Sequence, residues 1–105
     1  MKNESSIKEY QLKINNWIQK HGGYWPPLSM LGALIEEIGE LARIINNLEG
    51  FKPAKLNEES LNLGEEIADI FYALICIANY YNIDIAKKLD NSLKKIINRD
   101  SKRFL

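Results

Sequence analysis

The sequence of 105 residues holds only one cysteine, Cys76, and one histidine, His21. A lone cysteine can build neither an intrachain disulfide nor a thiolate metal cage, and its apolar neighbours predict a buried, inert thiol in a reducing compartment. Ferritin-like di-iron sites use Glu-x-x-His pairs, and the histidine stands outside any such pair. Because it lies beside two glycines, it is expected to be a turn residue rather than a catalytic base.

The chain also lacks long apolar runs and an excess of positive charge. No run of 18 apolar residues is present to span a bilayer, and residues 1–10 are too polar for a signal peptide, so we expect a cytoplasmic protein without membrane contact. Fourteen basic residues balance fourteen acidic ones, so no overall basic field attracts a nucleic acid polymer. The GxxxxGK[ST] loop of Walker-type ATPases is missing as well.

Glycine and proline mark two main breaks, at residues 22–27 and 50–53, and the segments around them are helix-sized. Within these segments apolar residues recur every three or four positions, and the alternation typical of strands is missing. The pattern predicts one all-α domain over residues 1–105, folded as an antiparallel bundle of about four helices. Their expected ranges are about 4–20, 27–48, from 58–61 to 81, and 85–103 after an Asp84 cap.

Two pairs of carboxylates repeat one spacing, Glu37-x-x-Glu40 and Glu66-x-x-Asp69. A separation of three residues places both acids of a pair on one shoulder of a helix, and the short connection between the two helices makes them antiparallel neighbours. Either pair alone would be an ordinary set of solvated helix charges. Four converging acids, with no Arg or Lys inside either motif, favour a hard cation such as Mg²⁺ or Mn²⁺.

The segment 67–78, IADIFYALICIA, has Asp69 as its only charged residue and is expected to be buried nearly all round. An unpaired ionised carboxylate in such a setting is costly, so it must be protonated, neutralised or bound to a cation. Because this helix is apolar on every side and three short helices are too few to cover it, we expect a partner subunit to pack against it.

Two segments, LIEEIGELARIINN and GEEIADIFYALICIANYYNIDI, resemble the MazG-like nucleotide pyrophosphohydrolases, and the resemblance covers nearly the whole chain. The hallmark of that family is an EExxE motif followed by ExxD, here Glu36-Glu37-x-x-Glu40 and Glu66-x-x-Asp69. The resemblance implies Mg²⁺-dependent cleavage of a nucleoside triphosphate into monophosphate and pyrophosphate. The expected role is house-cleaning of the nucleotide pool. The resemblance also implies a homodimer or a dimer of dimers, and a set of metal ligands formed by Glu37, Glu40, Glu66 and Asp69.

Four further residues are candidates for substrate binding. Lys95 and Arg99 match basic positions that the family associates with the triphosphate; they lie one helical turn apart, and the arginine fork suits phosphate oxygens. The alternative is a solvated basic helix end favoured by the helix dipole. Trp25 either stacks on a nucleobase or packs as a hydrophobic lid. Asn79 is either a buried hydrogen-bonding group or a substrate contact.

Glu36 or Glu37 is expected to orient or deprotonate the attacking water, because a carboxylate beside the metal needs only hydrogen-bond reach to act as a base. The alternative enzyme is a phosphoribosyl-ATP pyrophosphohydrolase of the same superfamily, although that family carries a histidine after ExxD where this chain has Phe71-Tyr72-Ala73. The alternative outside the enzymes is a non-catalytic helical module whose metal joins an interface.

Overall fold

Four helices account for most of the chain. The computed structural model describes residues 4–50 and 56–103, and the side chains of residues 4–50 and 62–103. The helices are α1 (Ile7–Lys20), α2 (Pro27–Glu49), α3 (Leu56–Tyr80) and α4 (Ile85–Ser101). No strand occurs in the described ranges, so the prediction of an all-α chain with four helices is confirmed.

The first helix begins at a capping box. The Ser6 hydroxyl accepts a hydrogen bond from the Glu9 amide at 3.1 Å, and the Glu9 carboxylate accepts one from the Ser6 amide at 3.0 Å. These bonds satisfy amides that the first turn of a helix leaves free, and they start α1 at Ile7, slightly later than expected. The helix ends at the expected glycine turn, where Gly22 and Gly23 take φ values of +101° and +85° that favour glycine.

The starts of α2 and α4 follow their predicted signals. Pro27 opens α2, where the missing amide hydrogen of proline costs no helical hydrogen bond. Asp84 caps α4 by accepting a hydrogen bond from the Lys87 amide at 3.2 Å. The third helix begins at Leu56, before the expected start, and ends at Tyr80.

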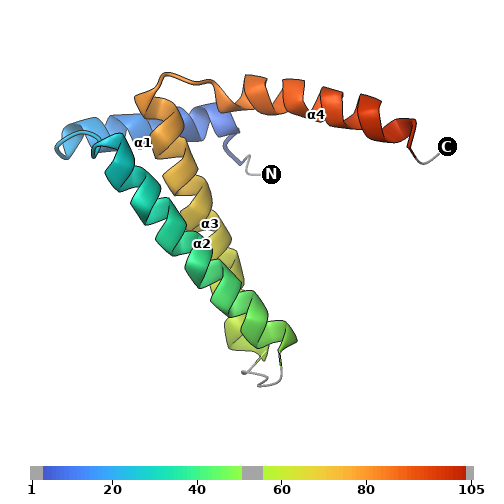
Figure 1. Ribbon diagram of the computed structural model, residues 1–105. Coiled ribbons are helices and arrows are strands. Elements are labelled where there is room, and N and C mark those ends of the chain that lie inside the picture. Colours follow the sequence, from blue (N-terminus) through green and yellow to red (C-terminus); the bar gives the residue numbers. More distant parts are fainter. Residues whose placement is uncertain (1–3, 51–55, 104–105) are drawn as a thin grey trace.

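The second and third helices form a long antiparallel hairpin, α1 crosses one end of it, and α4 leaves from that same end (Figure 1). Most contacts between helices join α2 to α3, while α1 packs against α3 and α4 packs against α1. The core is therefore small and lies where α1 crosses the hairpin. Its members are Ile18, Met30 and Cys76, with Ile14, Tyr24 and Ile77 packed against them. The thiol is buried, as predicted.

A single chain does not complete the predicted four-helix bundle. No described residue of α4 is buried, and its apolar stripe is 46–55% exposed, at Leu89, Leu93, Ile96 and Ile97. The antiparallel arrangement holds for α2 and α3, whereas α4 extends away from both (Figure 1). The reason lies in the turn after α3, which directs α4 past α1 instead of back along the hairpin.

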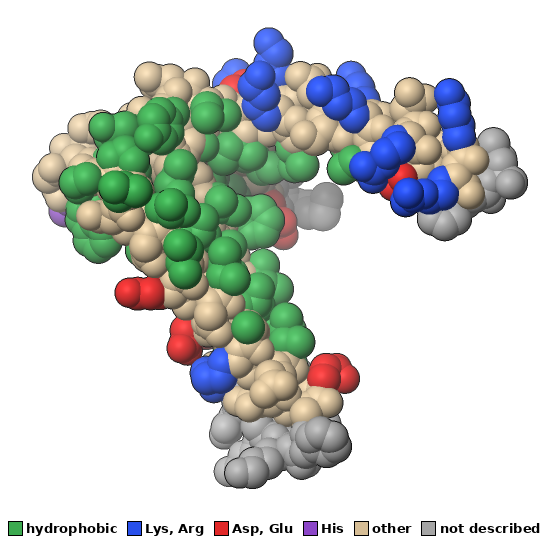
Figure 2. Space-filling model, in the orientation of Figure 1, with side chains coloured by type: hydrophobic (Ala, Val, Ile, Leu, Met, Phe, Trp, Pro, Cys, Tyr) green, Lys and Arg blue, Asp and Glu red, His purple; other side chains and the backbone are tan. Residues whose placement is uncertain are grey.

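The expectation that residues 67–78 are buried nearly all round is wrong for the single chain. Ile75, Cys76 and Ala78 are buried, but Asp69 is exposed and Phe71 keeps 55% of its surface. Because α3 packs against α1 and α2, its apolar side chains on other sides stay uncovered. Figure 2 shows exposed hydrophobic side chains gathered over the hairpin and α1. No described helix is both long enough and apolar enough to cross a membrane.

Candidate functional site

Three carboxylates converge between α2 and α3. Glu37 lies near the middle of α2, and Glu66 and Asp69 lie one turn apart on α3. One carboxylate oxygen from each residue comes within 4.8 Å of the other two. The antiparallel pairing produces this convergence, because it sets the middle of one helix beside the middle of the other. The structure thus brings together three of the four predicted metal ligands, and their role as ligands stays a prediction.

Glu40, the fourth predicted ligand, lies beside this carboxylate cluster rather than in it. Its Oε2 is 3.3 Å from Nε of Arg43, one turn further along α2, and both side chains are more than half exposed. An exposed ion pair of this kind contributes less than about 1 kcal/mol, so it does little to hold Glu40 away from a cation. The charge of Glu40 still raises the pKa of Glu66, so the two carboxylates lie within electrostatic range.

The acidity of Glu66 is strongly perturbed. Its pKa is raised to about 7, first by a hydrogen bond shared with the Glu37 carboxyl group, then by burial, and then by the charges of Glu37, Asp69 and Glu40. Two carboxyl groups share a hydrogen bond only when one of them holds a proton. The Oε2 atom of Glu66 is buried and has no hydrogen-bond partner among the described residues. This atom is therefore an open acceptor for a proton or a cation.

A cavity of about 500 Å³ opens beside the carboxylate cluster, with Glu37 and Asp69 in its lining. Its volume lies within the range of small-molecule sites, which are mostly apolar with a few convergent polar groups. A ligand here can place an anionic end near the acidic groups, through a cation, while a flat ring packs among aromatic side chains. The aromatic part of the lining consists of Trp17, His21, Tyr24, Trp25 and Tyr72.

Trp17 and His21 form a stacked pair on the cavity wall, with ring centroids 4.3 Å apart. Nδ1 of His21 lies 2.6 Å from the carbonyl oxygen of Trp17, and since a carbonyl can only accept, Nδ1 holds the proton and donates it. His21 is thus the turn residue that the sequence predicted, and it also forms part of the cavity. We did not predict this second role, although the two aromatic side chains stand four residues apart, a spacing of about one helical turn.

Three other candidates lie at the edge of the cluster or apart from it. Trp25 lines the cavity and is 65% exposed. Glu36 is exposed next to Glu37 and is not one of the three converging acids. Asn79 lies near the end of α3, where both atoms of its side-chain amide are hydrogen-bonded to Gln11. The catalytic and substrate roles assigned to these residues stay predictions.

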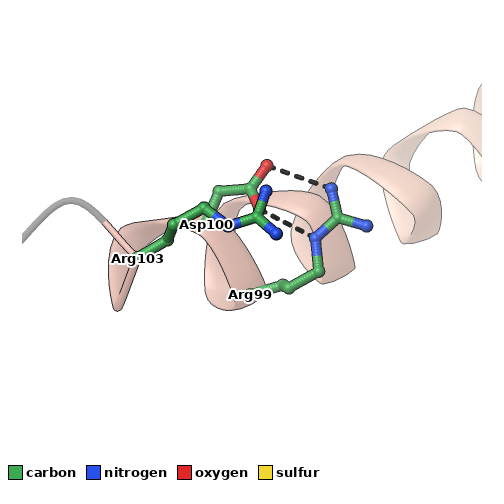
Figure 3. Close-up of polar contacts among 3 residues, drawn as sticks. All are labelled: Arg99, Asp100 and Arg103. Carbon is green, nitrogen blue, oxygen red and sulfur yellow. Dashed lines mark hydrogen bonds and ion pairs between the residues drawn. The ribbon is translucent and has the colours of Figure 1, made fainter.

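Lys95 and Arg99 lie on α4, which runs away from the hairpin that carries the cluster (Figure 1). Nε and Nη2 of Arg99 donate to the two carboxylate oxygens of Asp100 at 2.8 and 3.0 Å (Figure 3). Arg103 approaches the same carboxylate at 3.8 Å. The hydrogen bond with Asp100 raises the pKa of Arg99, which stays a cation. Within one chain, the two predicted phosphate-binding cations are not brought to the carboxylates.

Comparison with known proteins connects this chain to one family. The family model described as the MazG nucleotide pyrophosphohydrolase domain matches residues 26–104, a range that contains both carboxylate motifs. YpjD of Bacillus subtilis (strain 168) is 36% identical over 102 residues, which cover 96% of this chain and 92% of that protein.

Two crystal structures share the fold. That of YpjD from Bacillus subtilis has a TM-score of 0.80 and 35% sequence identity, with 90% of this chain and 97% of the other covered. That of the Bacillus-conserved MazG protein, a nucleotide pyrophosphohydrolase, has a TM-score of 0.77 and 31% identity, with 90% and 93% covered. The similarity therefore extends over nearly the full length of both proteins.

Proposed function

Because the chain belongs to the MazG nucleotide pyrophosphohydrolase family and is a hydrolase, we propose that it converts nucleoside or deoxynucleoside triphosphates to the monophosphate and pyrophosphate. The observation that carries this proposal is the convergence of Glu37, Glu66 and Asp69 within 4.8 Å beside an aromatic cavity. A triphosphate needs positive charge, which carboxylates supply only through bound cations, and a nucleobase needs a flat apolar wall. We expect the activity to serve the nucleotide pool of the cytoplasm.

The donor set fits a hard divalent cation, Mg²⁺ or Mn²⁺. Carboxylate oxygens are the ligands these ions prefer, and the buried Oε2 of Glu66 has no hydrogen-bond partner among the described residues. Glu37, Glu66 and Asp69 would hold the cation, and Glu40 would join them on leaving Arg43. A bound cation of this kind neutralises charge on phosphate oxygens and lowers the pKa of a bound water.

One of two adjacent carboxylates, Glu36 or Glu37, would take the proton of the water that attacks the α phosphorus. The water oxygen forms a new bond to the α phosphorus. The bond between the α phosphorus and the oxygen that bridges to the β phosphorus breaks, so pyrophosphate leaves. Glu37 is the nearer candidate, since it belongs to the cluster and lines the cavity, whereas Glu36 is exposed beside it. The exposed ring of Trp25, also in the lining, would stack on the base.

We also propose a homodimer or a dimer of dimers as the working assembly. Large apolar side chains are uncovered in the single chain on α2, α3 and α4, and Leu28 is 82% exposed. Removing such surface from water against a second copy contributes about 25 cal/mol per Å², which offsets the cost of association. Because α4 carries Lys95 and Arg99 away from the hairpin of its own chain, these cations would meet a triphosphate bound to another copy.

The test is incubation with Mg²⁺ and a panel of ribo- and deoxyribonucleoside triphosphates that also includes phosphoribosyl-ATP, with pyrophosphate and phosphate measured separately. Pyrophosphate release that falls at least about 100-fold in Asp69→Asn, with helix content retained by circular dichroism, supports the proposal. Asp90→Asn is the matched control, because Asp90 is exposed on α4 and pairs with Lys94. Phosphate release would indicate a different reaction, and turnover of phosphoribosyl-ATP alone would indicate the alternative enzyme. Metal binding without any turnover would favour a non-catalytic module.

A further inference from the structure

Gln11 is the only buried polar residue among those described, with 9% of its surface exposed. Its Nε2 donates to Oδ1 of Asn79 at 2.9 Å and to the carbonyl oxygen of Ile83 at 2.8 Å. Its Oε1 accepts from the amide of Ile85 at 3.1 Å. Both polar atoms of this buried side chain are thus paired with groups at least 68 residues further along the chain. Leaving the buried side-chain amide of Gln11 unpaired would be costly.

The orientation of both side-chain amides is fixed by backbone groups. Nδ2 of Asn79 donates to the backbone carbonyl oxygen of Gln11 at 2.9 Å, and a carbonyl can only accept, so Oδ1 must face the side chain of Gln11. The same reasoning turns Nε2 of Gln11 towards the Ile83 carbonyl and Oε1 towards the Ile85 amide. We call these two residues, Gln11 and Asn79, the amide clamp. Flipping either amide would set acceptor against acceptor or donor against donor.

The amide clamp joins three consecutive parts of the chain to α1. Asn79 lies in the last turn of α3, Ile83 lies in the connecting turn, and Ile85 is the first residue of α4. The turn holds one residue, Asn82, in the left-handed region with φ +57°, and the amide of Ile83 donates to Ala78 at 2.8 Å. The path of the backbone from α3 into α4 is therefore fixed by hydrogen bonds on both sides.

The direction of α4 depends on its first turn, because no described residue along it is buried. Arg99 lies about 21 Å along the axis from Ile85, at a rise of roughly 1.5 Å per residue. A change of about 20° in the direction of the helix at its start would move Arg99 by about 7 Å over that length. Such a displacement is larger than any hydrogen-bond distance, so a small loss of order at the turn would remove a cation from its ligand.

We propose that Gln11 is a positioning residue, which through the amide clamp fixes the direction in which α4 presents Lys95 and Arg99. The functional part of this inference rests on the proposed function, in which those cations bind the triphosphate. It assigns Asn79 to the support of α4 rather than to direct contact with substrate. The structural part stands on the hydrogen bonds and burial alone.

Hydrogen exchange tests the structural part. In Gln11→Leu, which introduces an apolar side chain of similar size and removes all three side-chain bonds, exchange at the amide of Ile85 and the first turn of α4 should accelerate at least about tenfold. Exchange in the core of α2 and α3 should be unchanged. Gln19→Leu is the matched control on the same helix, since Gln19 is exposed. Unchanged exchange at Ile85, or equal acceleration throughout the chain, would overturn the proposal.

A second variant tests the proposal even if Gln11→Leu folds poorly. Gln11→Glu keeps the shape of the side chain and the acceptor for the Ile85 amide, but it places a second oxygen against Oδ1 of Asn79 and the Ile83 carbonyl. The same local acceleration is expected, because two of the three bonds are lost and oxygen–oxygen contacts replace them. An exchange pattern identical to that of the unmodified protein would again contradict the proposed role of the amide clamp.

Kinetics test the functional part. If Gln11 acts through the cations of α4, Gln11→Leu should raise KM for the triphosphate, and it should add nothing further once Lys95→Ala and Arg99→Ala are present. Effects that multiply would show that Gln11 does not act through these residues and would overturn its positioning role. Absence of turnover by the unmodified protein would instead reject the proposed function, while the exchange experiment would still decide on the clamp.

Discussion

Divalent cation binding should depend on pH through one proton held at Glu66. The pKa of this carboxyl group is raised to about 7 by its contact with Glu37, by burial and by neighbouring charges, so below that pH a cation must displace a proton from the cluster. One displaced proton corresponds to affinity that falls about tenfold per pH unit below 7 and becomes flat above it. About half a proton should be released per cation at pH 7, and nearly a whole one at pH 6.

Isothermal titration calorimetry of the metal-free protein with Mn²⁺ or Mg²⁺ measures the affinity. Repeating it in buffers of different ionisation enthalpy gives the number of protons released per cation. Nucleotide is left out, because its phosphates titrate in the same range. Glu66→Gln removes the titrating group and should give weaker binding that no longer varies between pH 6 and 8. Affinity independent of pH in the unmodified protein, or proton release that does not rise as the pH falls, would refute the assignment of the proton to this cluster.

Four further outcomes follow from the structure. Without cations, the free energy of unfolding should fall as pH rises from 4.5 towards about 7, because the folded state keeps the proton of Glu66 that the unfolded state has lost; urea titration at several pH values measures this. Trp25→Ala should raise KM by at least about fivefold with little change in kcat, if base stacking contributes at least about 1 kcal/mol. If Lys95 and Arg99 act on the site of another chain, mixing Glu66→Gln chains with chains that carry Lys95→Ala and Arg99→Ala should restore about a quarter of the activity of the unmodified protein. If they act on the site of their own chain, the mixture should have no activity. Ser6→Ala should lower the free energy of unfolding by about 1 kcal/mol, measured by chemical denaturation, through loss of the cap of α1.

Features of the fold with local causes were predictable from the sequence. The proline that opens α2, the aspartate that caps α4 and the glycines that end α1 each act within a few residues of their own position. Burial was not predictable in the same way. A helix that is apolar all round shows that its surface needs cover, but it does not show whether that cover comes from its own chain, so Asp69 was expected to be more buried than it is.

The carboxylate cluster was partly predictable, because equal spacing on two antiparallel helices brings matching positions together. Spacing does not fix the rotation of each helix about its axis, and Glu40, about 60° from Glu37 around α2, therefore falls beside the cluster with Arg43. Of the amide clamp, Asn79 was a candidate for a buried hydrogen-bonding group, whereas Gln11 gave no sequence signal. Gln11 is a single polar residue on a polar helix, and its hydrogen-bond partners lie 68 to 74 residues away.

The most direct measurement is hydrolysis of a nucleoside triphosphate in water enriched in ¹⁸O with Mg²⁺ present, followed by mass spectrometry of the products. Attack on the α phosphorus, beside the cluster of Glu37, Glu66 and Asp69, predicts one ¹⁸O atom in the nucleoside monophosphate and none in pyrophosphate. Label in pyrophosphate, release of single phosphate, or turnover that persists unchanged after all three carboxylates are replaced by amides would contradict the proposed chemistry.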